Sequence, residues 1–144
     1  MKIAIGSDHG GFKMKEEILS YLKEKNIEYY DFGTYAEESC DYPVFAKKVA
    51  NAVASGEYEK GILFCGTGIG MSIAANKVKG VRSASVTNEY CAEFTRRHND
   101  LNVLCLGGRT VGIEIAKRIV DIFIETPFDG GRHSTRVEMY ETNE

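Results

Sequence analysis

Short apolar runs alternate along the chain with segments in which apolar residues recur at helical spacing. Runs of a few apolar residues are typical of buried strands, whereas apolar residues at i, i+4 and i+8 share one face of a helix. We therefore predict strands over residues 2–5, 28–32, 61–65, 82–86 and 102–106. The same patterns predict helices over residues 11–25, 41–55, 69–78, 88–97, 110–123 and 131–141.

This alternation of strand and helix predicts parallel strands joined by right-handed crossovers. The expected fold is a three-layer α/β/α sandwich with a five-stranded, parallel, Rossmann-like sheet. In such folds ligands bind beyond the carboxyl ends of the strands, where the strand order reverses. The chain has 144 residues and no internal repeat or linker, so residues 1–144 are expected to form a single domain.

Composition and charge narrow the class of protein. The chain has 18 basic and 21 acidic residues, a formal charge of −3, and this balance argues against a nucleic-acid partner. No apolar run approaches the roughly 18 residues that a membrane span needs. The N-terminal apolar run ends at Gly6 and is too short for a signal peptide. We expect a cytoplasmic protein without a membrane partner, whose cysteines are reduced.

Glycines cluster where strands are predicted to end and helices to begin. The strongest cluster is CGTGIG at residues 65–70, which joins a buried strand to a helix. Backbone N–H groups in such a loop can hold an anion at the helix N-terminus. The spacing matches neither the P-loop nor the dinucleotide fingerprint. A tight turn that needs glycine only for packing is the alternative interpretation.

One of the four cysteines, Cys65, stands at the predicted end of the central strand. A position at a helix N-terminus lowers the pKa of a thiol, so Cys65 could serve as a general base. The alternative role for a free cysteine is that of a small buried apolar residue. We expect this second role for Cys91 and Cys105, and Cys40 is left undecided.

Polar residues follow the first predicted strand and end the fourth predicted helix. Asp8 and His9 come directly after the first strand, where they could contact hydroxyl or phosphate groups. Asp8 could equally cap the following helix. His98 and Asn99 end the fourth predicted helix, a position that the helix dipole favours for histidine with or without a function.

Arginines near the C-terminus form a candidate phosphate site. Arg132 and Arg136 are four residues apart and share a helix face, and Arg109 follows the fifth strand. An anion bound between two guanidinium groups would offset the unfavourable position of Arg132 in the first helical turn. Pairing with Asp129 and Glu138 on the surface is the alternative.

A metal site is not expected. The cysteines lack zinc-finger spacing, and the other possible ligands do not lie at i, i+4 on one helix. The set considered is Asp8, His9, Asp41, Cys65 and His98.

Together these segments resemble the type B ribose-5-phosphate isomerases, within a wider group that includes galactose-6-phosphate and allose-6-phosphate isomerases. The similarity covers essentially the whole chain. Its motifs are KIAIGSDHGGFKMKE at the start, DYP at 41–43, GILFCGTGIGMSIAANK at 61–77, RRHND at 96–100, LCLGGRTVG at 104–112 and GRHSTRV at 131–137.

The resemblance implies an enzyme that interconverts ribose 5-phosphate and ribulose 5-phosphate through a cis-enediolate, with no metal or other cofactor. It implies that Cys65 is the base, that Thr67 assists at the enediolate oxygens and that His98 opens the sugar ring. A second branch carries a glutamate base where this chain has Met71, so the chain resembles the cysteine type. The implied substrate-binding residues are Asp8, His9, Tyr42, Gly66, Thr67, Gly68, Ile69, Gly70, Asn99, Arg109, Arg132 and Arg136.

The resemblance also implies a homodimer whose active sites are shared between chains, with His98 and the C-terminal arginines supplied by the partner of the chain that supplies Cys65. Whether two dimers join into a tetramer is left open. The implied strand order is 2-1-3-5-4. Two alternatives remain: an isomerase for a six-carbon sugar 6-phosphate, and a sensor that binds a phosphosugar without reacting.

Overall fold

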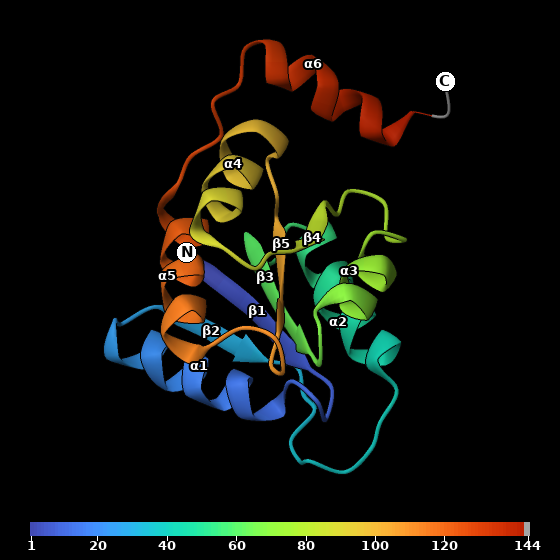
Figure 1. Cartoon of the computed structure of the whole chain (residues 1–144). Coiled ribbons are helices and arrows are strands. Elements are labelled where there is room, and N and C mark those ends of the chain that lie inside the picture. The colour runs from blue at the N-terminus through green and yellow to red at the C-terminus, as the bar shows by residue number, and fades with distance from the viewer. Residues whose placement is uncertain (143–144) are drawn as a thin grey trace.

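The computed structural model describes residues 1–142 and contains one sheet of five parallel strands between two layers of helices (Figure 1). The sheet order is β2-β1-β3-β5-β4, which confirms the predicted architecture and strand order. The strands are β1 Lys2–Ser7, β2 Glu28–Asp31, β3 Lys60–Cys65, β4 Ser83–Ser85 and β5 Val103–Gly107.

Within residues 1–142, six α-helices follow the predicted order along the chain. They are α1 Phe12–Glu24, α2 Tyr42–Ala54, α3 Ile69–Ala75, α4 Glu89–Asn99, α5 Ile113–Glu125 and α6 Arg132–Glu138, after which a 3₁₀ turn, η1, covers Met139–Glu141. The predicted tail helix over residues 131–141 is therefore a two-turn α-helix followed by a 3₁₀ turn.

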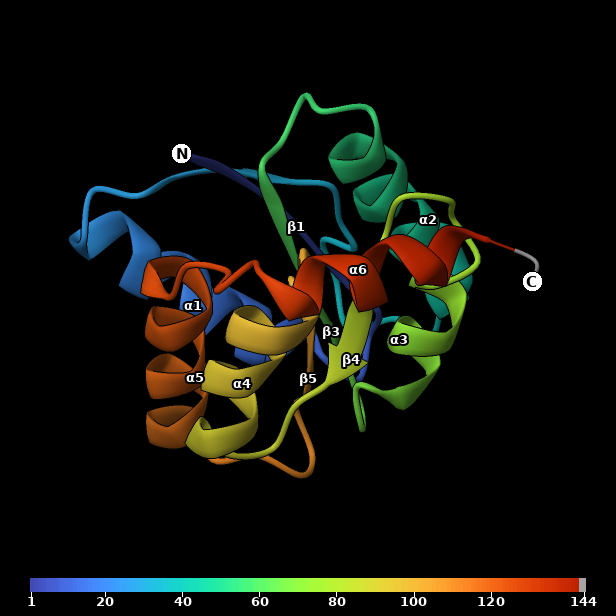
Figure 2. The ribbon, with the colours of Figure 1, turned by 90° about the horizontal axis from the view of Figure 1, so that it is seen from above.

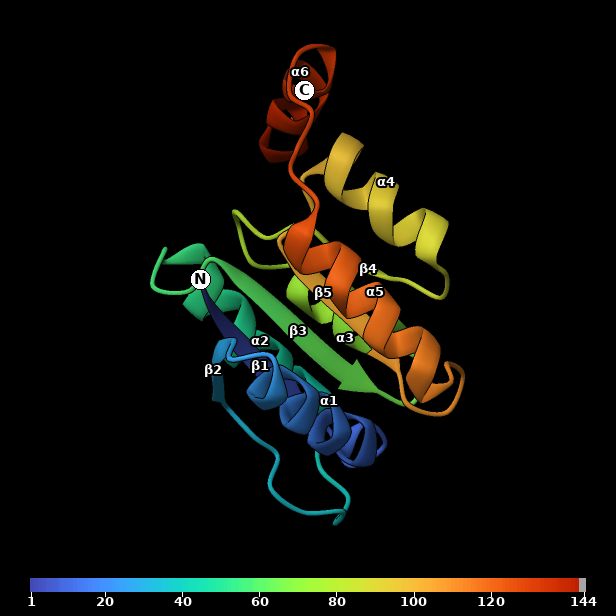
Figure 3. The same cartoon turned by 90° about the vertical axis from the view of Figure 1, so that its left-hand side faces the viewer.

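Alternate residues of the central strand face two separate cores. Ile62 and Phe64 pack in the core formed with α1, α4 and α5, whereas Leu63 and Cys65 pack in the core formed with α2 and α3. This is the period of two expected for a strand whose two faces are both buried. Figures 2 and 3 show the two helical layers on either side of the sheet.

The direction of the chain reverses between β1 and β3. From β1 the chain crosses through α1 to β2 at one edge, and then returns through α2 to β3 on the other side of β1. Right-handed crossovers in opposite directions place their helices on opposite faces, as observed. The carboxyl ends of β1 and β3 therefore flank a switch point, which is the expected position of a ligand site.

Two helix boundaries differ from the prediction by three residues because side chains and turns form local hydrogen bonds. The helix predicted to reach residue 78 ends at Ala75, since the Asn76 side chain bonds to both backbone groups of Ser83 at 2.8 and 2.9 Å. The helix predicted to begin at residue 110 begins at Ile113. The N–H groups of Thr110 and Val111 donate instead to the Gly107 carbonyl in a tight turn.

Among the described residues, no helix combines the length and the apolar character needed to cross a membrane.

Candidate active site

The loop after β3 curls around the sulfur of Cys65. Cys65 is 5% exposed, and its Sγ accepts a hydrogen bond from the Gly68 N–H at 3.0 Å. Gly68 has a φ of 80°, and a Cβ at this position would lie 2.7 Å from Ser85 Oγ, so the turn requires glycine. Thr67 Oγ1 accepts the Ile69 N–H at 3.2 Å, which leaves the hydroxyl proton of Thr67 free to donate to a ligand.

Asp8 and His9 lie beside this loop, across the switch point. The Asp8 N–H donates to the Phe64 carbonyl at 3.1 Å, and Asp8 Oδ1 accepts the Gly11 N–H at 3.0 Å. Asp8 thus closes the turn that leads into α1 but does not cap the helix itself, whose N-cap residue is Gly11 and has no side-chain cap hydrogen bond. Its second carboxylate oxygen is not used in the bond to Gly11. A Cβ on Gly10 would lie 3.2 Å from the Gly66 nitrogen, so the two loops are in direct contact.

Arg109 and Tyr42 complete this group at the carboxyl ends of the strands. The Gly108 N–H donates to the Cys65 carbonyl at 2.8 Å, and the Arg109 N–H donates to the Gly66 carbonyl at 3.0 Å. The Arg109 guanidinium lies over Gly66, where a Cβ would be 3.3 Å from Nη1. The Tyr42 ring covers Gly70 in the same way, since a Cβ there would be 2.8 Å from Cε2.

The remaining predicted residues lie at the opposite end of the sheet. Helix α4 begins near the carboxyl end of β4 and runs back for 11 residues, about 16 Å, to His98 and Asn99. Helix α6, which carries Arg132 and Arg136, lies beyond this end (Figure 1). One chain therefore brings the predicted residues together in two groups. The carboxyl-end group contains Asp8, His9, Tyr42, Cys65, Gly66, Thr67, Gly68, Ile69, Gly70 and Arg109, and the amino-end group contains His98, Asn99, Arg132 and Arg136.

Arg96 holds the amino-end group in place. It is 7% exposed, its Nε donates to the Thr126 carbonyl at 3.0 Å, and its Nη1 contacts Asp100 Oδ1 at 2.9 Å. Asp100 ends α4 in the left-handed conformation, with a φ of 49°. The last turn of α4 is thus joined to the segment that leads from α5 to α6.

Aromatic stacking also links α4 to α6. The rings of His98 and His133 stack with their centroids 4.1 Å apart and an interplanar angle of 10°. The Phe94 ring contacts His98 edge-on, with the two centroids 4.9 Å apart. Burial and the nearby charges of His98, Arg132 and Arg136 lower the pKa of His133. In the sequence, His133 is marked only by its place between the two arginines of GRHSTRV. Its contact with His98 depends on the tertiary fold.

The alternative prediction, in which Arg132 and Arg136 pair with Asp129 and Glu138, is not observed within residues 1–142. Asp129 pairs with Arg97, whose Nε lies 3.2 Å from each carboxylate oxygen. Neither Arg132 nor Arg136 forms an ion pair within those residues. Both guanidinium groups are therefore available to an anion.

Among residues 1–142, the set considered from the sequence (Asp8, His9, Asp41, Cys65 and His98) contains no three residues whose ligand atoms lie close together. A different group does come together: one possible ligand atom from each of His98, Asp129 and His133 lies within 4.8 Å of the other two. Imidazole lone pairs lie in the plane of the ring, and the two rings are nearly parallel. One ring would have to rotate before both could bind the same ion.

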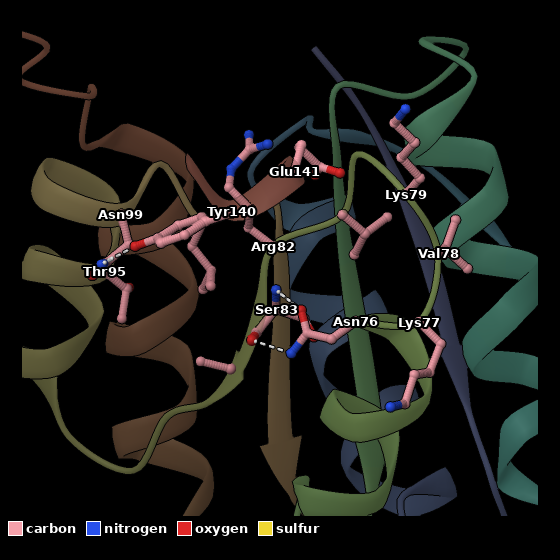
Figure 4. A pocket seen from close by; sticks show the side chains of 13 residues that line it. Asn76, Lys77, Val78, Lys79, Arg82, Ser83, Thr95, Asn99, Tyr140 and Glu141 are labelled. Carbon is pink, nitrogen blue, oxygen red and sulfur yellow. Dashed lines mark hydrogen bonds between the residues drawn. The ribbon is translucent and has the colours of Figure 1, made fainter. Parts of the chain in front are cut away.

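A pocket of about 460 Å³ adjoins the amino-end group (Figure 4). It lies beside the edge strand β4, between the loop that follows α3 and the last turn of α4. Asn99 lines it and donates from Nδ2 to Tyr140 Oη at 2.9 Å. The Glu141 side chain accepts the Gly80 N–H across the pocket mouth at 3.1 Å. Tyr140 was not among the predicted residues, because nothing in the sequence of the tail distinguishes it.

The other cysteines differ from Cys65. Cys105 is fully buried as predicted, and burial raises the pKa of its thiol. The prediction that Cys91 packs in the core is wrong, since it is exposed on α4. Cys40 is half-buried, and its N–H donates to His9 Nδ1 at 3.2 Å.

These features define a doubly wound α/β protein with a glycine loop and a cysteine at its switch point. The family model described as Ribose/Galactose Isomerase matches residues 3–140. The ribose-5-phosphate isomerase B of Escherichia coli is 52% identical over 137 residues, 95% of this chain and 92% of that protein. The D-erythrulose-4-phosphate isomerase of Pectobacterium atrosepticum is 39% identical over 96% of this chain and 91% of its own length.

A solved structure of ribose-5-phosphate isomerase B from Clostridium thermocellum has the same fold. Its TM-score is 0.96 at 55% identity, and the match covers 98% of this chain and 95% of that one. The chain therefore belongs to the ribose/galactose isomerase family.

Proposed function

We propose that this protein is an aldose–ketose isomerase that interconverts ribose 5-phosphate and ribulose 5-phosphate without a metal. The observation that carries the proposal is the position of the Cys65 sulfur, inside the glycine loop at the end of the central strand and bonded to the Gly68 N–H. Isomerisation needs a base next to the carbon that loses its proton and donors at the oxygen that gains charge. This loop can supply both.

In the proposed reaction the Cys65 thiolate removes the proton from C2 of the open-chain aldose. The electron pair of the broken C–H bond forms the C1–C2 double bond, and the carbonyl oxygen on C1 becomes part of a cis-enediolate. Backbone N–H groups of residues 66–70 and the Thr67 hydroxyl would stabilise that charge. Return of the proton from the Cys65 thiol to C1 and transfer of the O2 proton to O1 complete the ketose and restore the thiolate.

The separation of the two residue groups supports a site that two chains share. Strand β4 is an edge of the sheet, with a free side that could face a second copy. A two-fold axis beside β4 would run the two sheets in opposite directions and bring the amino end of one chain to the carboxyl end of the other. Exposed apolar side chains on the neighbouring helices, Ile69, Ile73 and Tyr90, would be covered there.

In such a homodimer each group completes the other. His98 of one chain would open the furanose ring beside Cys65 of its partner. Arg132, Arg136 and Asn99 would join His9 and Arg109 around the phosphate, and Asp8 and Tyr42 would contact the sugar. Guanidinium groups bind phosphate oxygens with good geometry, and the two C-terminal arginines have no carboxylate partner within residues 1–142.

The test is isomerase activity of the wild type and of Cys65→Ala against four-, five- and six-carbon aldose phosphates. We expect the highest kcat/KM for ribose 5-phosphate and a loss of about 10³-fold or more in kcat for Cys65→Ala, with phosphosugar binding retained. Cys105→Ala is the matched control and should keep near-normal turnover. Near-normal turnover by Cys65→Ala would overturn the assignment of the base.

The same panel tests a second substrate class. The family description includes galactose, and the Pectobacterium relative is named for a four-carbon phosphate. Pockets discriminate between sugars that differ by one carbon by only a few kcal/mol. A higher kcat/KM for a six-carbon 6-phosphate would assign the chain to that reaction. Tight binding without deuterium exchange at C2 in heavy water would instead indicate a sensor.

A further inference from the structure

A fully buried lysine lies behind the carboxyl-end group, and the proposed reaction does not use it. Lys15 of α1 is 0% exposed. Its Nζ donates to both carboxylate oxygens of Asp31 at 2.9 Å and to the Thr34 carbonyl. These three bonds use all three N–H groups of the ammonium. Because burial of a charge is costly unless it is fully paired, this arrangement fixes the three groups relative to one another.

Lys15 and Asp31 hold one end of residues 33–41, which we name the strap and which form most of the segment that joins β2 to α2. Asp31 Oδ1 also accepts the Gly33 N–H at 2.9 Å. The Ser7 N–H donates to the Gly33 carbonyl at 2.7 Å, and the Thr34 N–H donates to the Ser7 carbonyl at 2.8 Å. The strap therefore begins alongside Ser7, two residues before His9.

The other end of the strap reaches the His9 side chain. The Cys40 N–H lies 3.2 Å from His9 Nδ1. A backbone N–H can only donate, so Nδ1 must accept, and the proton of a neutral imidazole is then carried by Nε2. The strap thus selects the tautomer in which Nε2–H is a donor that an oxygen of the substrate can use.

We propose that Lys15 is a positioning residue for His9. Through Asp31 and the strap it keeps the Cys40 N–H on Nδ1, so that Nε2–H faces the phosphosugar in a single orientation. The proposal rests on the proposed function for the contact between His9 and substrate. The link between Lys15 and the His9 tautomer is a separate statement and can be measured separately.

The variant for this test is Lys15→Met with Asp31→Asn. Methionine fills a similar volume, and asparagine keeps an acceptor for the Gly33 N–H, so no unpaired charge is buried. We expect KM for ribose 5-phosphate to rise about tenfold with kcat changed less than about twofold, the size expected for one misplaced hydrogen bond. Asp31→Glu, which keeps a carboxylate for the Lys15 charge but displaces it, is the second variant if the double variant folds poorly, and should give a smaller shift. Lys23→Met, an exposed lysine of the same helix, should leave both constants unchanged.

The positioning role is separated from a general structural role by repeating the change in a His9→Ala background. If Lys15 acts through His9, adding Lys15→Met and Asp31→Asn to the His9→Ala variant should raise its KM by less than about twofold. An equal factor in both backgrounds would overturn the proposal. If His9→Ala itself leaves the kinetics unchanged, the proposed contact with substrate is wrong.

Nitrogen-15 NMR of the His9 ring tests the link without any activity. The wild type should show a single tautomer with the proton on Nε2, and the Lys15 and Asp31 variant should show a mixture. An unchanged Nε2–H tautomer in that variant would show that the strap does not depend on Lys15 and would overturn the inference.

Discussion

At the scale of single residues, two buried cysteines show how position separates chemistry from packing. Cys65 and Cys105 lie in neighbouring strands and face the same core of α2 and α3. Cys105 lies within its strand and is fully buried, which raises the pKa of its thiol. Cys65 is the last residue of its strand, where the sulfur meets the Gly68 N–H and the mouth of the loop. The pair is therefore a matched control for the proposed base.

Ser7 supports a prediction about stability at the same scale. Its hydroxyl is fully buried and has no hydrogen-bond partner within residues 1–142. An unpaired buried hydroxyl costs stability, so Ser7→Ala should raise the free energy of unfolding by about 1 kcal/mol. Thermal unfolding should then shift upward by about 3 °C. Ser83→Ala is the control with the opposite sign, since the Ser83 hydroxyl donates to the Ser72 carbonyl at 2.9 Å. Equal losses in both variants would contradict the prediction.

At the scale of secondary-structure elements, a second buried lysine joins the start of β3 to the end of α5. Lys60 is 6% exposed, and its Nζ donates to the Ile124 carbonyl at 3.2 Å. Burial, followed by the charge of Arg96, lowers the pKa of Lys60 from 10.5 to about 8, against the opposing effects of Glu59 and Asp100. In the unfolded chain the lysine keeps its ordinary pKa, so the two states bind different numbers of protons between these values.

This difference predicts how stability changes with pH. Between pH 8 and 10.5 the unfolded chain holds a proton that the folded chain has lost, so the contribution of Lys60 to stability rises with pH across that window. The full change corresponds to about 3 kcal/mol at most. The free energy of unfolding in urea should therefore be measured for the wild type and for Lys60→Met. The value for the wild type minus the value for Lys60→Met should increase from pH 8 upward. The same difference for the exposed Lys23→Met should stay flat; a flat or falling difference for Lys60→Met would refute the assignment.

Elements of this fold can be predicted from sequence where one pattern decides them. The run GILFC is apolar because both faces of β3 are buried, and its two flanking segments have helical periodicity. The end of α3 could not be predicted, because it depends on hydrogen bonds from Asn76 to Ser83, seven residues further on. The contact between Cys40 and His9 has no sequence signal either, since it is made by a backbone N–H.

At the scale of the whole molecule, the residue types were predictable from the sequence pattern, whereas their separation was implied only by the family resemblance. The glycine loop, His98 and the arginines stand out by composition and by their place at element ends. Their distribution over two ends of the sheet follows from the direction in which α4 runs back along the strands, a property of the topology. Because Cys65 and His98 cannot meet within one chain, catalysis by both residues requires a second copy.

Mixing two inactive variants tests that requirement. Cys65→Ala and His98→Asn should each be nearly inactive alone. In a mixed dimer one site would carry both substitutions and the other neither, so random exchange of subunits should restore about a quarter of the wild-type activity. Steady-state assays after dissociation and reassembly measure the restoration. Mixing Cys65→Ala with Arg109→Ala is the control: both residues belong to the carboxyl-end group, so every site keeps one defect and activity should stay low. Restoration in the control, or none in the test pair, would mean that the two groups do not meet across a dimer interface.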